Sequence, residues 1–259
     1  MGSENGQRER AFVTGATSGI GRSIAIRLAG RGAIFAVVGR NRATANSVAD
    51  EVTASGGEAC VLTVDVSDAR QVEAAVKEFS TKYGGIDTVV ASAGIALTGS
   101  VTDCSLSDWD RLLATNLTGA FYLARFSMPE LIKTQGTFTA ISSDAGVQGA
   151  CGYAAYIVSK HGLNGLVKSL ALDYGKYGVR SNAVCPAFVE TPMAEQLLKD
   201  VSPAELAYFK GVVPLGRFAR PDEVAAAVAH LTSKDASYVN GLMYRLDAGS
   251  TAGYYLAMT

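Results

Sequence analysis

The chain has 259 residues, of which 48% are hydrophobic and 18% charged, and its formal net charge is −1. This size and apolar content predict one large α/β domain with a substantial core. The near-neutral charge argues against nucleic acid as the main partner, which requires a basic face. No apolar run reaches the ~18–20 residues that a membrane span needs.

The cysteines and the first residues predict the compartment. The four cysteines, at positions 60, 104, 151 and 185, are widely spaced and form no C-x-x-C pair, and the chain has only two histidines. A metal site is therefore not expected. The sequence starts with the polar stretch MGSENGQRER, which lacks the apolar core of a signal peptide. Scattered reduced thiols and this polar start predict a cytoplasmic protein without a membrane partner.

A glycine-rich segment directly follows the first predicted strand, Arg10–Thr14. The sequence GATSGIG places Gly15, Gly19 and Gly21 at the start of a helix, because apolar residues follow at helical spacing. Glycines let the backbone approach a ligand closely, and a helix N-terminus favours a phosphate. The spacing is G-x3-G-x-G and not the general dinucleotide fingerprint G-x-G-x-x-G. A purely structural glycine turn is therefore the alternative.

The end of the second predicted strand, Ala33–Val38, favours one cofactor. Dinucleotide-binding folds commonly carry an acid about 20 residues after the glycines, which holds the ribose hydroxyls of the adenosine. Gly39 and then Arg40 occupy that place here. An arginine cannot accept a hydrogen bond from the 2′-hydroxyl, but it pairs well with a 2′-phosphate. The sequence therefore favours NADP(H), with NAD(H) and a merely solvated Arg40 and Arg42 as the alternatives.

Helices and strands alternate along the first half of the chain. The expected elements are a helix over Thr44–Ser55, a strand over Ala59–Val64, a helix around Val72–Phe79, a strand over Ile86–Ala91, a long helical region over about Ser107–Lys133, and a strand over Thr137–Ser142. This alternation predicts a parallel, doubly wound sheet. Ser143 would then lie at the carboxyl end of the fifth strand, where open α/β sheets bind ligands.

Tyr156 and Lys160 lie four residues apart on a predicted helix that ends near Gly175, so they share one helix face. A free tyrosine has a pKa near ~10 and is a poor acid–base catalyst at neutral pH. A lysine ammonium within about 4–6 Å lowers that pKa. A serine from the preceding strand end could hold a substrate oxygen beside the phenol. The alternative is a half-buried tyrosine beside a solvated lysine.

The last third of the chain contains a strand over Val179–Val184, two polar helical patches within about Met193–Lys210, a helix that begins near Arg220, and a strand over Leu242–Leu246. The irregular segment at about 190–212 is the candidate for a mobile lid. We find no internal repeat and no linker, so residues 1–259 are expected to form a single domain.

Five motifs, TGATSGIG, TNLTG, ISS, YIVSK and CPAFVETPM, stand together in one order and spacing. In this combination the chain resembles the short-chain dehydrogenase/reductase family, including its 3-oxoacyl reductase-like and carbonyl reductase members, over about residues 8–249. The resemblance implies a single-domain Rossmann-type fold, that is, a doubly wound parallel sheet of about seven strands with helices on both faces. It also implies an NAD(P)-dependent oxidoreductase that acts on a CH–OH group.

By this resemblance the catalytic residues are Asn116, Ser143, Tyr156 and Lys160. Ser143 is preferred to Ser142 because the family usually places its serine about 13 residues before the tyrosine. The family mechanism gives Tyr156 the proton transfer and Ser143 a hydrogen bond to the substrate oxygen. Lys160 would lower the phenol pKa and hold the nicotinamide ribose, while Asn116 would support a water next to Lys160. The alternative for Asn116 is a cap or kink of its helix.

The cofactor is expected to occupy the glycine loop, the ends of the second to fourth strands, and the loop after the sixth strand. An acid–hydrophobe pair, Asp65 and Val66, is implied for the adenine. The residues expected at the cofactor are Gly15, Thr17, Ser18, Gly19, Ile20, Gly21, Arg40, Asn41, Asp65, Val66, Ala93, Gly94, Tyr156, Lys160, Pro186, Val189 and Thr191.

The chain departs from the family pattern at three places. The family's N-N-A-G is Ala91-Ser92-Ala93-Gly94 here, so the bracing role of the lost asparagine passes to Ser92 or lapses. The usual Pro-Gly is Pro186-Ala187, which predicts a stiffer loop. Pro129 and Tyr177 stand where reductases of carrier-bound substrates tend to carry basic residues. This last difference favours a small, freely diffusing carbonyl substrate.

The substrate pocket is expected near the catalytic residues, with candidates Ser143, Asp144, Gln148, Cys151, Tyr153 and Phe188. Asp144 could hold a substrate hydroxyl or cap the turn, and both readings are open. Cys151 is expected to pack, since no basic residue nearby in the sequence would activate its thiol.

The leading hypothesis is an oxidoreductase that transfers a hydride between NADP(H) and a small carbonyl or secondary alcohol. The alternatives are an NAD-dependent dehydrogenase of a sugar, polyol or steroid alcohol, and a dinucleotide-sensing protein without catalysis. The resemblance also implies a homotetramer with the helices at Ser107–Lys133 and Tyr153–Gly175 in an interface.

Overall fold

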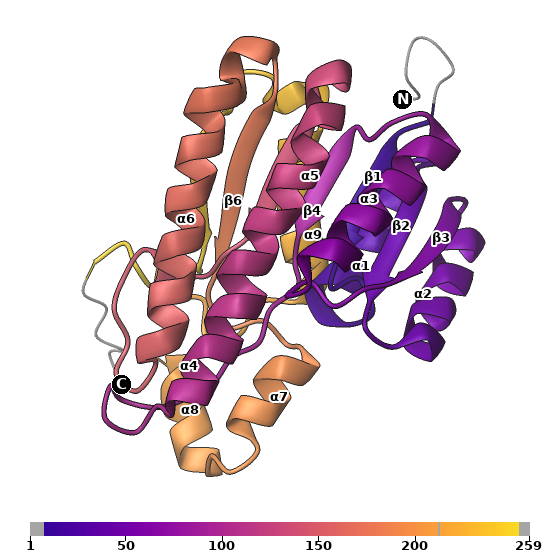
Figure 1. Cartoon of the computed structure of the whole chain (residues 1–259). Helices are drawn as coiled ribbons and strands as arrows, with labels where there is room; N and C mark the ends of the chain where they lie inside the picture. The colour runs from indigo at the N-terminus through magenta and orange to yellow at the C-terminus, as the bar shows by residue number, and fades with distance from the viewer. Residues whose placement is uncertain (1–7, 212, 254–259) are drawn as a thin grey trace.

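A seven-stranded parallel sheet forms the centre of the molecule (Figure 1). The structure, a computed structural model, describes residues 8–211 and 213–253. The strands are β1 (Arg10–Thr14), β2 (Ile34–Gly39), β3 (Glu58–Thr63), β4 (Thr88–Ala91), β5 (Thr137–Ile141), β6 (Arg180–Pro186) and β7 (Met243–Leu246). Their order, β3-β2-β1-β4-β5-β6-β7, reverses direction between β1 and β4. This order confirms the predicted doubly wound sheet of about seven strands.

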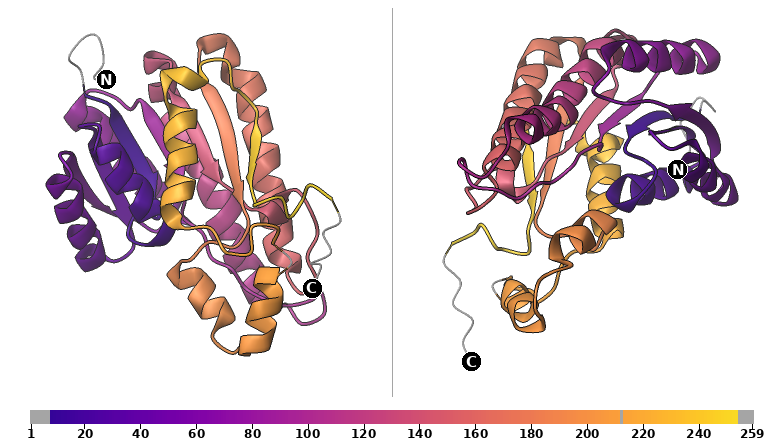
Figure 2. Two further views of the ribbon diagram at one scale, coloured as in Figure 1. Left: turned by 180° about the vertical axis from the view of Figure 1, so that it is seen from behind. Right: turned by 60° about the horizontal axis from the view of Figure 1, so that its bottom comes forward.

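Helices cover both faces of the sheet (Figure 2). They are α1 (Gly19–Ala29), α2 (Arg42–Ala54), α3 (Ala69–Tyr83), α4 (Leu106–Leu113), α5 (Gly119–Thr134), α6 (Ala154–Tyr174), α7 (Pro192–Leu198), α8 (Pro203–Gly211) and α9 (Pro221–Thr232). One core layer joins α3, α5 and α6 to the sheet, and the other joins α1, α2 and α9. None of these helices, within the described ranges, is long and apolar enough to cross a membrane.

The central strands are almost fully buried because helices cover both faces of the sheet. All five residues of β1 are buried, and successive side chains point to opposite faces. Phe12 therefore enters one core layer, while Ala11 and Val13 enter the other. Backbone and polar groups can therefore meet a ligand at the two edges of the sheet where the strands begin and end, which we call the amino edge and the carboxyl edge.

The long helical region predicted over about Ser107–Lys133 is interrupted. It consists of α4, a π-helical turn at Ala114–Thr118, and α5. In the turn the Gly119 N–H donates to the Ala114 carbonyl five residues earlier, which is the π-helical pattern. The predicted helical region is therefore confirmed, but hydrophobic periodicity alone does not reveal one extra residue in a helix, so the π-helical turn was not predicted.

The helices α7 and α8 occupy the segment predicted as a lid. Both lie beyond the carboxyl ends of the strands (Figure 1). The last position of the predicted insertion, 212, lies outside the described residues.

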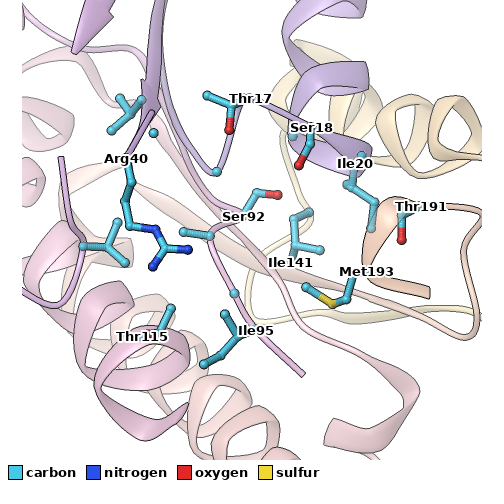
Figure 3. A pocket seen from close by; sticks show the side chains of 18 of the residues that line it. Thr17, Ser18, Ile20, Arg40, Ser92, Ile95, Thr115, Ile141, Thr191 and Met193 are labelled. Carbon is cyan, nitrogen blue, oxygen red and sulfur yellow. The ribbon is translucent and has the colours of Figure 1, made fainter. Parts of the chain in front are cut away.

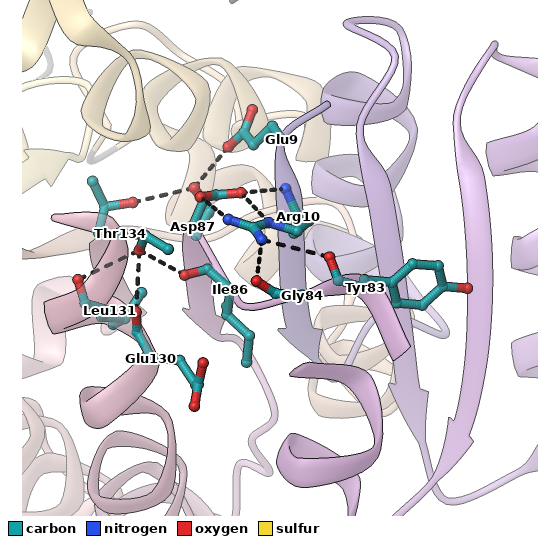
Figure 4. A network of polar contacts seen from close by, with 11 residues as sticks. Glu9, Arg10, Tyr83, Gly84, Ile86, Asp87, Glu130, Leu131 and Thr134 are labelled. Atoms are coloured by element: carbon teal, nitrogen blue, oxygen red, sulfur yellow. Dashed lines mark hydrogen bonds and ion pairs between the residues drawn. The ribbon is translucent and has the colours of Figure 1, made fainter. Parts of the chain in front are cut away.

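A polar network closes the amino ends of β1 and β4 (Figure 4). The Arg10 guanidinium donates to both carboxylate oxygens of Asp87, at 2.7 Å each, and to the Gly84 carbonyl at 2.5 Å. Thr88 donates to Glu9 at 2.6 Å, and burial raises the pKa of this glutamate. The charged and polar groups of this network therefore pair with one another.

Candidate active site

The opposite edge of the sheet holds a cleft of about 240 Å³ (Figure 3). It lies where the strand order reverses, outside the carboxyl ends of β1 and β4. This is the place where open α/β sheets bind ligands. Of the residues expected at the cofactor, those that line the cleft are Gly15, Thr17, Ser18, Gly19, Ile20, Gly21, Arg40, Asp65, Val66, Ala93, Gly94, Tyr156, Lys160 and Thr191.

The glycine loop presents bare backbone to the cleft. Gly15 has a φ of 67°, and a Cβ at this position would lie 2.7 Å from the backbone of Ala93. Ser18, the N-cap residue of α1, makes no side-chain hydrogen bond to the first turn, whereas Asn41 and Asp68 cap α2 and α3. The amide groups at the start of α1 therefore lack a side-chain cap, as expected of a phosphate site.

Arg40, at the end of β2, is exposed and extends into the cleft (Figure 3). The preceding Gly39 packs against Thr17: a Cβ at position 39 would lie 2.4 Å from Thr17 Cγ2. An acidic side chain therefore does not fit at position 39 while Thr17 keeps its place. A hydrogen bond from Ser67 lowers the pKa of Asp65, and attraction to Arg40 adds to this.

Three predicted cofactor residues do not line the cleft. Asn41 accepts hydrogen bonds from the N–H groups of Ala43 and Thr44, at 2.9 and 3.1 Å, so its side chain is used as the cap of α2. Pro186 is the last residue of β6 and is buried, and Val189 packs in the core layer of α1 and α9. The side chains of these three residues therefore do not line the cleft, and their contact with the cofactor stays a prediction.

Several residues that line the cleft were not predicted. They are Val38, Gly39, Val64, Ser92, Ile95, Thr115, Ile141, Ser142, Pro192 and Met193. Most of them stand at or just after the carboxyl end of a strand, and that position was a usable signal. Thr115 and Met193 come from the π-helical turn and from the first turn of α7, where the sequence carries no such signal.

Tyr156 and Lys160 lie on one face of α6, as predicted, with the lysine Nζ 5.6 Å from the centre of the phenol ring. The Nζ donates to the carbonyl of Ile141, at the end of β5, at 2.8 Å. The lysine side chain is buried, and burial lowers its pKa to about 8. The ammonium is thus held where the strand end, the phenol and the cleft meet.

The electrostatics of Tyr156 differ from the expectation. Burial raises the pKa of its phenol to about 12, the hydrogen bond with Ser143 lowers it, and the charge of Asp144 raises it. The expected lowering of this pKa by Lys160 was therefore wrong. Loss of water around the phenol outweighs the lysine, whose Nζ is directed to the Ile141 carbonyl.

Ser143 meets Tyr156, and Ser142 does not. Ser143 precedes a short 3₁₀ turn, hydrogen-bonds with the Tyr156 phenol, and donates to Asp144 Oδ1 at 2.8 Å. The Ser142 hydroxyl instead donates to the backbone carbonyl of Lys160 at 3.4 Å. The geometry supports Ser143 as the serine of the catalytic group.

Asn116 lies in the π-helical turn and is 1% exposed. Its amide donates to the Ile95 carbonyl and accepts from the Ile95 N–H, both at 2.8 Å, and it also donates to Ser159 at 3.2 Å. The side chain thus pairs with the loop after β4 as a neighbouring strand would. Asn116 thus positions the loop after β4, and its expected contact with a water next to Lys160 stays a prediction.

The loop after β4 is braced by Thr14. Its hydroxyl accepts from the N–H groups of Ser92 and Ala93, at 3.2 and 3.4 Å. The Ser92 N–H takes part in this brace, and the expectation that the bracing role of the lost asparagine passes to Ser92 or lapses stays a prediction. Thr14, at the end of β1, provides the brace, and Ser92 lines the cleft.

The substrate candidates separate into two groups. Near the phenol, the Tyr153 ring lies 6.4 Å from that of Tyr156, and exposed Gln148 donates to Asp144 at 3.4 Å. Cys151 is exposed on the same loop.

Phe188 lies elsewhere. Its ring stacks on Phe218 at 5.2 Å and approaches Phe209 of α8 at 6.2 Å. It lines a second cavity, of about 320 Å³, together with the ends of β6 and β7. Its aromatic contacts are with Phe209 and Phe218, and its contact with the substrate stays a prediction.

Comparisons with known proteins agree with this geometry. The sequence model of a family described as enoyl-(acyl carrier protein) reductase matches residues 15–251. The chain is 36% identical to meso-2,3-butanediol dehydrogenase of Serratia marcescens, over 93% of each protein. It is 33% identical to 3-oxoacyl-[acyl-carrier-protein] reductase FabG of Thermotoga maritima, over 92% of this chain and 96% of the relative.

The solved structure of levodione reductase superposes with a TM-score of 0.92 at 32% identity, covering 95% of this chain and 98% of the other. The family implies NAD(P)(H) as the cofactor and a CH–OH group as the reacting centre, and the uncapped start of α1 and the cradle at Gly15 fit such a dinucleotide. With its doubly wound sheet and the Ser143–Tyr156–Lys160 group, the chain belongs to the short-chain dehydrogenase/reductase family.

Proposed function

We propose that the chain transfers a hydride between NADP(H) and a small carbonyl or secondary alcohol, with Tyr156 as the general acid and base. The observation that carries this proposal is the convergence of Ser143, Tyr156 and Lys160 at one end of the cleft. The glycine loop and Arg40 form the rest of the same cleft. A single extended dinucleotide would span both parts.

Two features support the preference for NADP(H). Arg40 extends into the cleft, and within the described residues its guanidinium has no hydrogen-bond or ion-pair partner. A 2′-phosphate would supply that partner. A Cβ at Gly39 would also lie 2.4 Å from Thr17 Cγ2, so the acid that would hold a ribose diol does not fit there while Thr17 keeps its place.

The residues of the chain supply the proton chemistry, and the nicotinamide supplies or accepts the hydride when it is bound. The phenol of Tyr156 is protonated at neutral pH because its pKa is about 12, so it can donate to a carbonyl oxygen. Ser143 lies next to the phenol and can hydrogen-bond the same oxygen. Lys160, anchored on the Ile141 carbonyl, places a cation beside both groups.

A small substrate fits the named relatives and the surface. The names of meso-2,3-butanediol dehydrogenase, cyclohexanol dehydrogenase and levodione reductase refer to small alcohols or ketones. Pro129, inside α5, and Tyr177 replace the basic residues expected where an acidic carrier protein docks. We therefore propose a freely diffusing substrate.

We also propose a homotetramer built on the outer faces of α4, α5 and α6. Four apolar side chains are exposed there: Leu106, Phe121, Val158 and Leu172. Burying such side chains between copies is favourable. Sedimentation velocity checks the assembly, and a purely monomeric protein would overturn it.

The function is tested by following oxidation of NADPH and of NADH with a panel of ketones, diketones, β-ketoacyl thioesters and ketoses. We expect turnover of a small ketone or diketone with NADPH, and the reverse reaction with the matching alcohol. Tyr156→Phe serves as the control for catalysis by this site. Equal use of both cofactors would remove the argument from Arg40. Cofactor binding without turnover of any carbonyl would favour the dinucleotide sensor.

A further inference from the structure

The hydroxyl of Ser143 has two competing acceptors. A serine hydroxyl has one proton to donate and two lone pairs that accept. Ser143 donates to Asp144 Oδ1 at 2.8 Å and accepts from the Ala145 N–H at 3.1 Å. The same hydroxyl hydrogen-bonds with the phenol of Tyr156. Its single proton cannot serve both Asp144 and an oxygen at the reaction centre.

Asp144 sits in an environment that disfavours its ionised form. It is half-buried, and burial raises the pKa of its carboxyl. The bonds from Ser143, the Ala145 N–H and Gln148 act in the opposite direction. Among the described residues, no lysine or arginine forms an ion pair with it.

Two titratable groups on other elements interact with this carboxyl. Asp247, directly after β7, repels it, and Tyr156 of α6 interacts with it in turn. Burial opposes ionisation of Asp247, but hydrogen bonds from Thr251 and Gly249 lower its pKa, so its charge persists. The phenol of Tyr153, also on this side of α6, interacts with that of Tyr156. Asp144 therefore gains and loses its proton next to other acidic groups, which are a carboxyl and two phenols.

We propose that Asp144 is a positioning residue for Ser143: ionised, it holds the Ser143 hydroxyl away from the reaction centre, and protonated, it releases that hydroxyl to the substrate oxygen. A carboxylate accepts the serine proton in a charge-assisted hydrogen bond, which a neutral substrate oxygen does not match. A protonated carboxyl can instead donate to the serine oxygen. The proton on Asp144 comes from solvent and returns to it, and no bond of the substrate is altered. This proposal rests on the proposed function.

The consequence is an additional step in the pH profile of carbonyl reduction. The value of kcat/KM falls as the pH rises through the titration of Asp144, by roughly tenfold or more, because one oxyanion donor is withdrawn. This step lies on the acidic side of the step of Lys160, whose pKa is about 8, and of the step of Tyr156, whose pKa is about 12.

The decisive variant is Asp144→Asn, whose neutral amide resembles the protonated acid and does not titrate. We expect its profile to lose the acidic step and to keep the step of Lys160. The control Asp110→Asn removes an exposed carboxylate from α4 and should keep the wild-type profile. An acidic step of wild-type size in Asp144→Asn would overturn the proposal.

A second variant does not depend on the folding of the first. Asp247→Asn removes the negative charge that repels Asp144 and retains one oxygen, which can accept from the N–H of Gly249 or of Thr251. The acidic step should move to lower pH, because ionisation of Asp144 becomes easier. A step that stays in place would show that another group titrates.

A third measurement needs no turnover and separates this proposal from the proposed function. The carboxyl of Asp144 is followed by ¹³C NMR in the free protein, and the same titration is run on Ser143→Ala. Loss of the bond from Ser143 should raise the pKa of Asp144 further, because that bond favours the ionised form. An unchanged pKa would overturn the Ser143–Asp144 link, whereas absence of turnover together with a raised pKa would overturn the proposed function and leave that link intact.

Discussion

The two edges of the parallel sheet use similar residues for opposite purposes. At the amino edge, Arg10 and Asp87 satisfy each other and the loop before β4 (Figure 4). At the carboxyl edge, Arg40 reaches into the cleft (Figure 3), and the Lys160 Nζ donates to the Ile141 carbonyl and lies over the Tyr156 ring. The polar groups at the amino edge pair with one another and stabilise the fold, whereas those at the carboxyl edge face the cleft. Stability and function are thus separated along the strands.

The backbone explains why the amino edge closes. Gly84 and Gly85 have positive φ values, 79° and 133°, and direct the Gly84 carbonyl at the guanidinium of Arg10. A Cβ at Gly85 would lie 3.0 Å from Arg10 Nη1. The glycines at the carboxyl edge make a comparable cradle, but its centre is left for a phosphate.

The largest expected effect is on catalysis at the carboxyl edge. Tyr156→Phe removes the only phenol proton of the catalytic group, so turnover should fall by about 10²–10⁴-fold. Binding of NADPH and the melting temperature should stay near wild-type values. Steady-state kinetics and fluorescence titration measure the two quantities. Retained turnover would assign the proton transfer to another group.

The next effect concerns the amino edge. Arg10→Met keeps the apolar stem and leaves Asp87 without its partner, which should lower the free energy of unfolding by about 3 kcal/mol. The side chains are 7% and 31% exposed, so the pair is shielded from water. Denaturant unfolding gives the value, and kcat at low temperature should be unchanged.

Arg8→Ala is the matched control for this variant. The pair of Arg8 with Glu58 is 42% and 47% exposed, and its loss should change the free energy of unfolding by less than about 1 kcal/mol. Equal losses in the two variants would contradict the contrast between a shielded and a solvated pair.

A stabilising substitution is expected at the carboxyl edge. Burial lowers the pKa of Lys160 from 10.5 to about 8, so the folded protein bears the cost of a charged lysine at neutral pH. Lys160→Met should raise the free energy of unfolding at pH 7 by about 1–3 kcal/mol, although the Ile141 carbonyl loses its donor. Turnover should be lost.

The pH dependence of this effect has a defined sign. Below about pH 8 the lysine is protonated in both states, and the difference between variant and wild type is constant. Between about pH 8 and 10.5 the unfolded chain binds more protons, so wild-type stability rises with pH. Lys160→Met should lack that rise in denaturant titrations. A constant difference across this window would contradict the shifted pKa.

The smallest effect expected is on cofactor choice. Arg40→Ala should weaken NADPH binding roughly 10- to 100-fold, because the charge-assisted hydrogen bonds to the 2′-phosphate are lost. Binding of NADH, which lacks that phosphate, should be unchanged. Arg42→Ala, which removes an exposed arginine at the first position of α2, is the control. Isothermal titration with both cofactors gives the ratio. A parallel loss for NADH would mean that Arg40 contacts a part common to both.

The sequence was informative wherever one local pattern determined one local structure. Continuous apolar runs located the strands, and their alternation with helices gave the parallel order. The four-residue spacing placed Tyr156 and Lys160 on one face of α6. The glycine loop marked the start of α1. These features depend on near neighbours in the chain.

The features that the sequence did not predict depend on which of several possible partners a side chain contacts. Asn41 is drawn to cap α2, and Phe188 is drawn into a stack with Phe218. The pKa of Tyr156 depends on burial by elements distant in the sequence. The role of Thr14 as a brace required the β1–β4 pairing. Competition between partners cannot be read from spacing alone.

The π-helical turn at Ala114–Thr118 constrains how the length of this chain can vary. A π-turn holds one residue more than an α-helix of the same rise, and each residue corresponds to about 100° of helix rotation. Deleting any one residue of the turn would restore a regular helix but rotate α4 against α5. Asn116 would then lose its paired hydrogen bonds to Ile95. Sequence relatives that keep this loop geometry should therefore show no single-residue gaps across this segment, whereas surface turns can tolerate them.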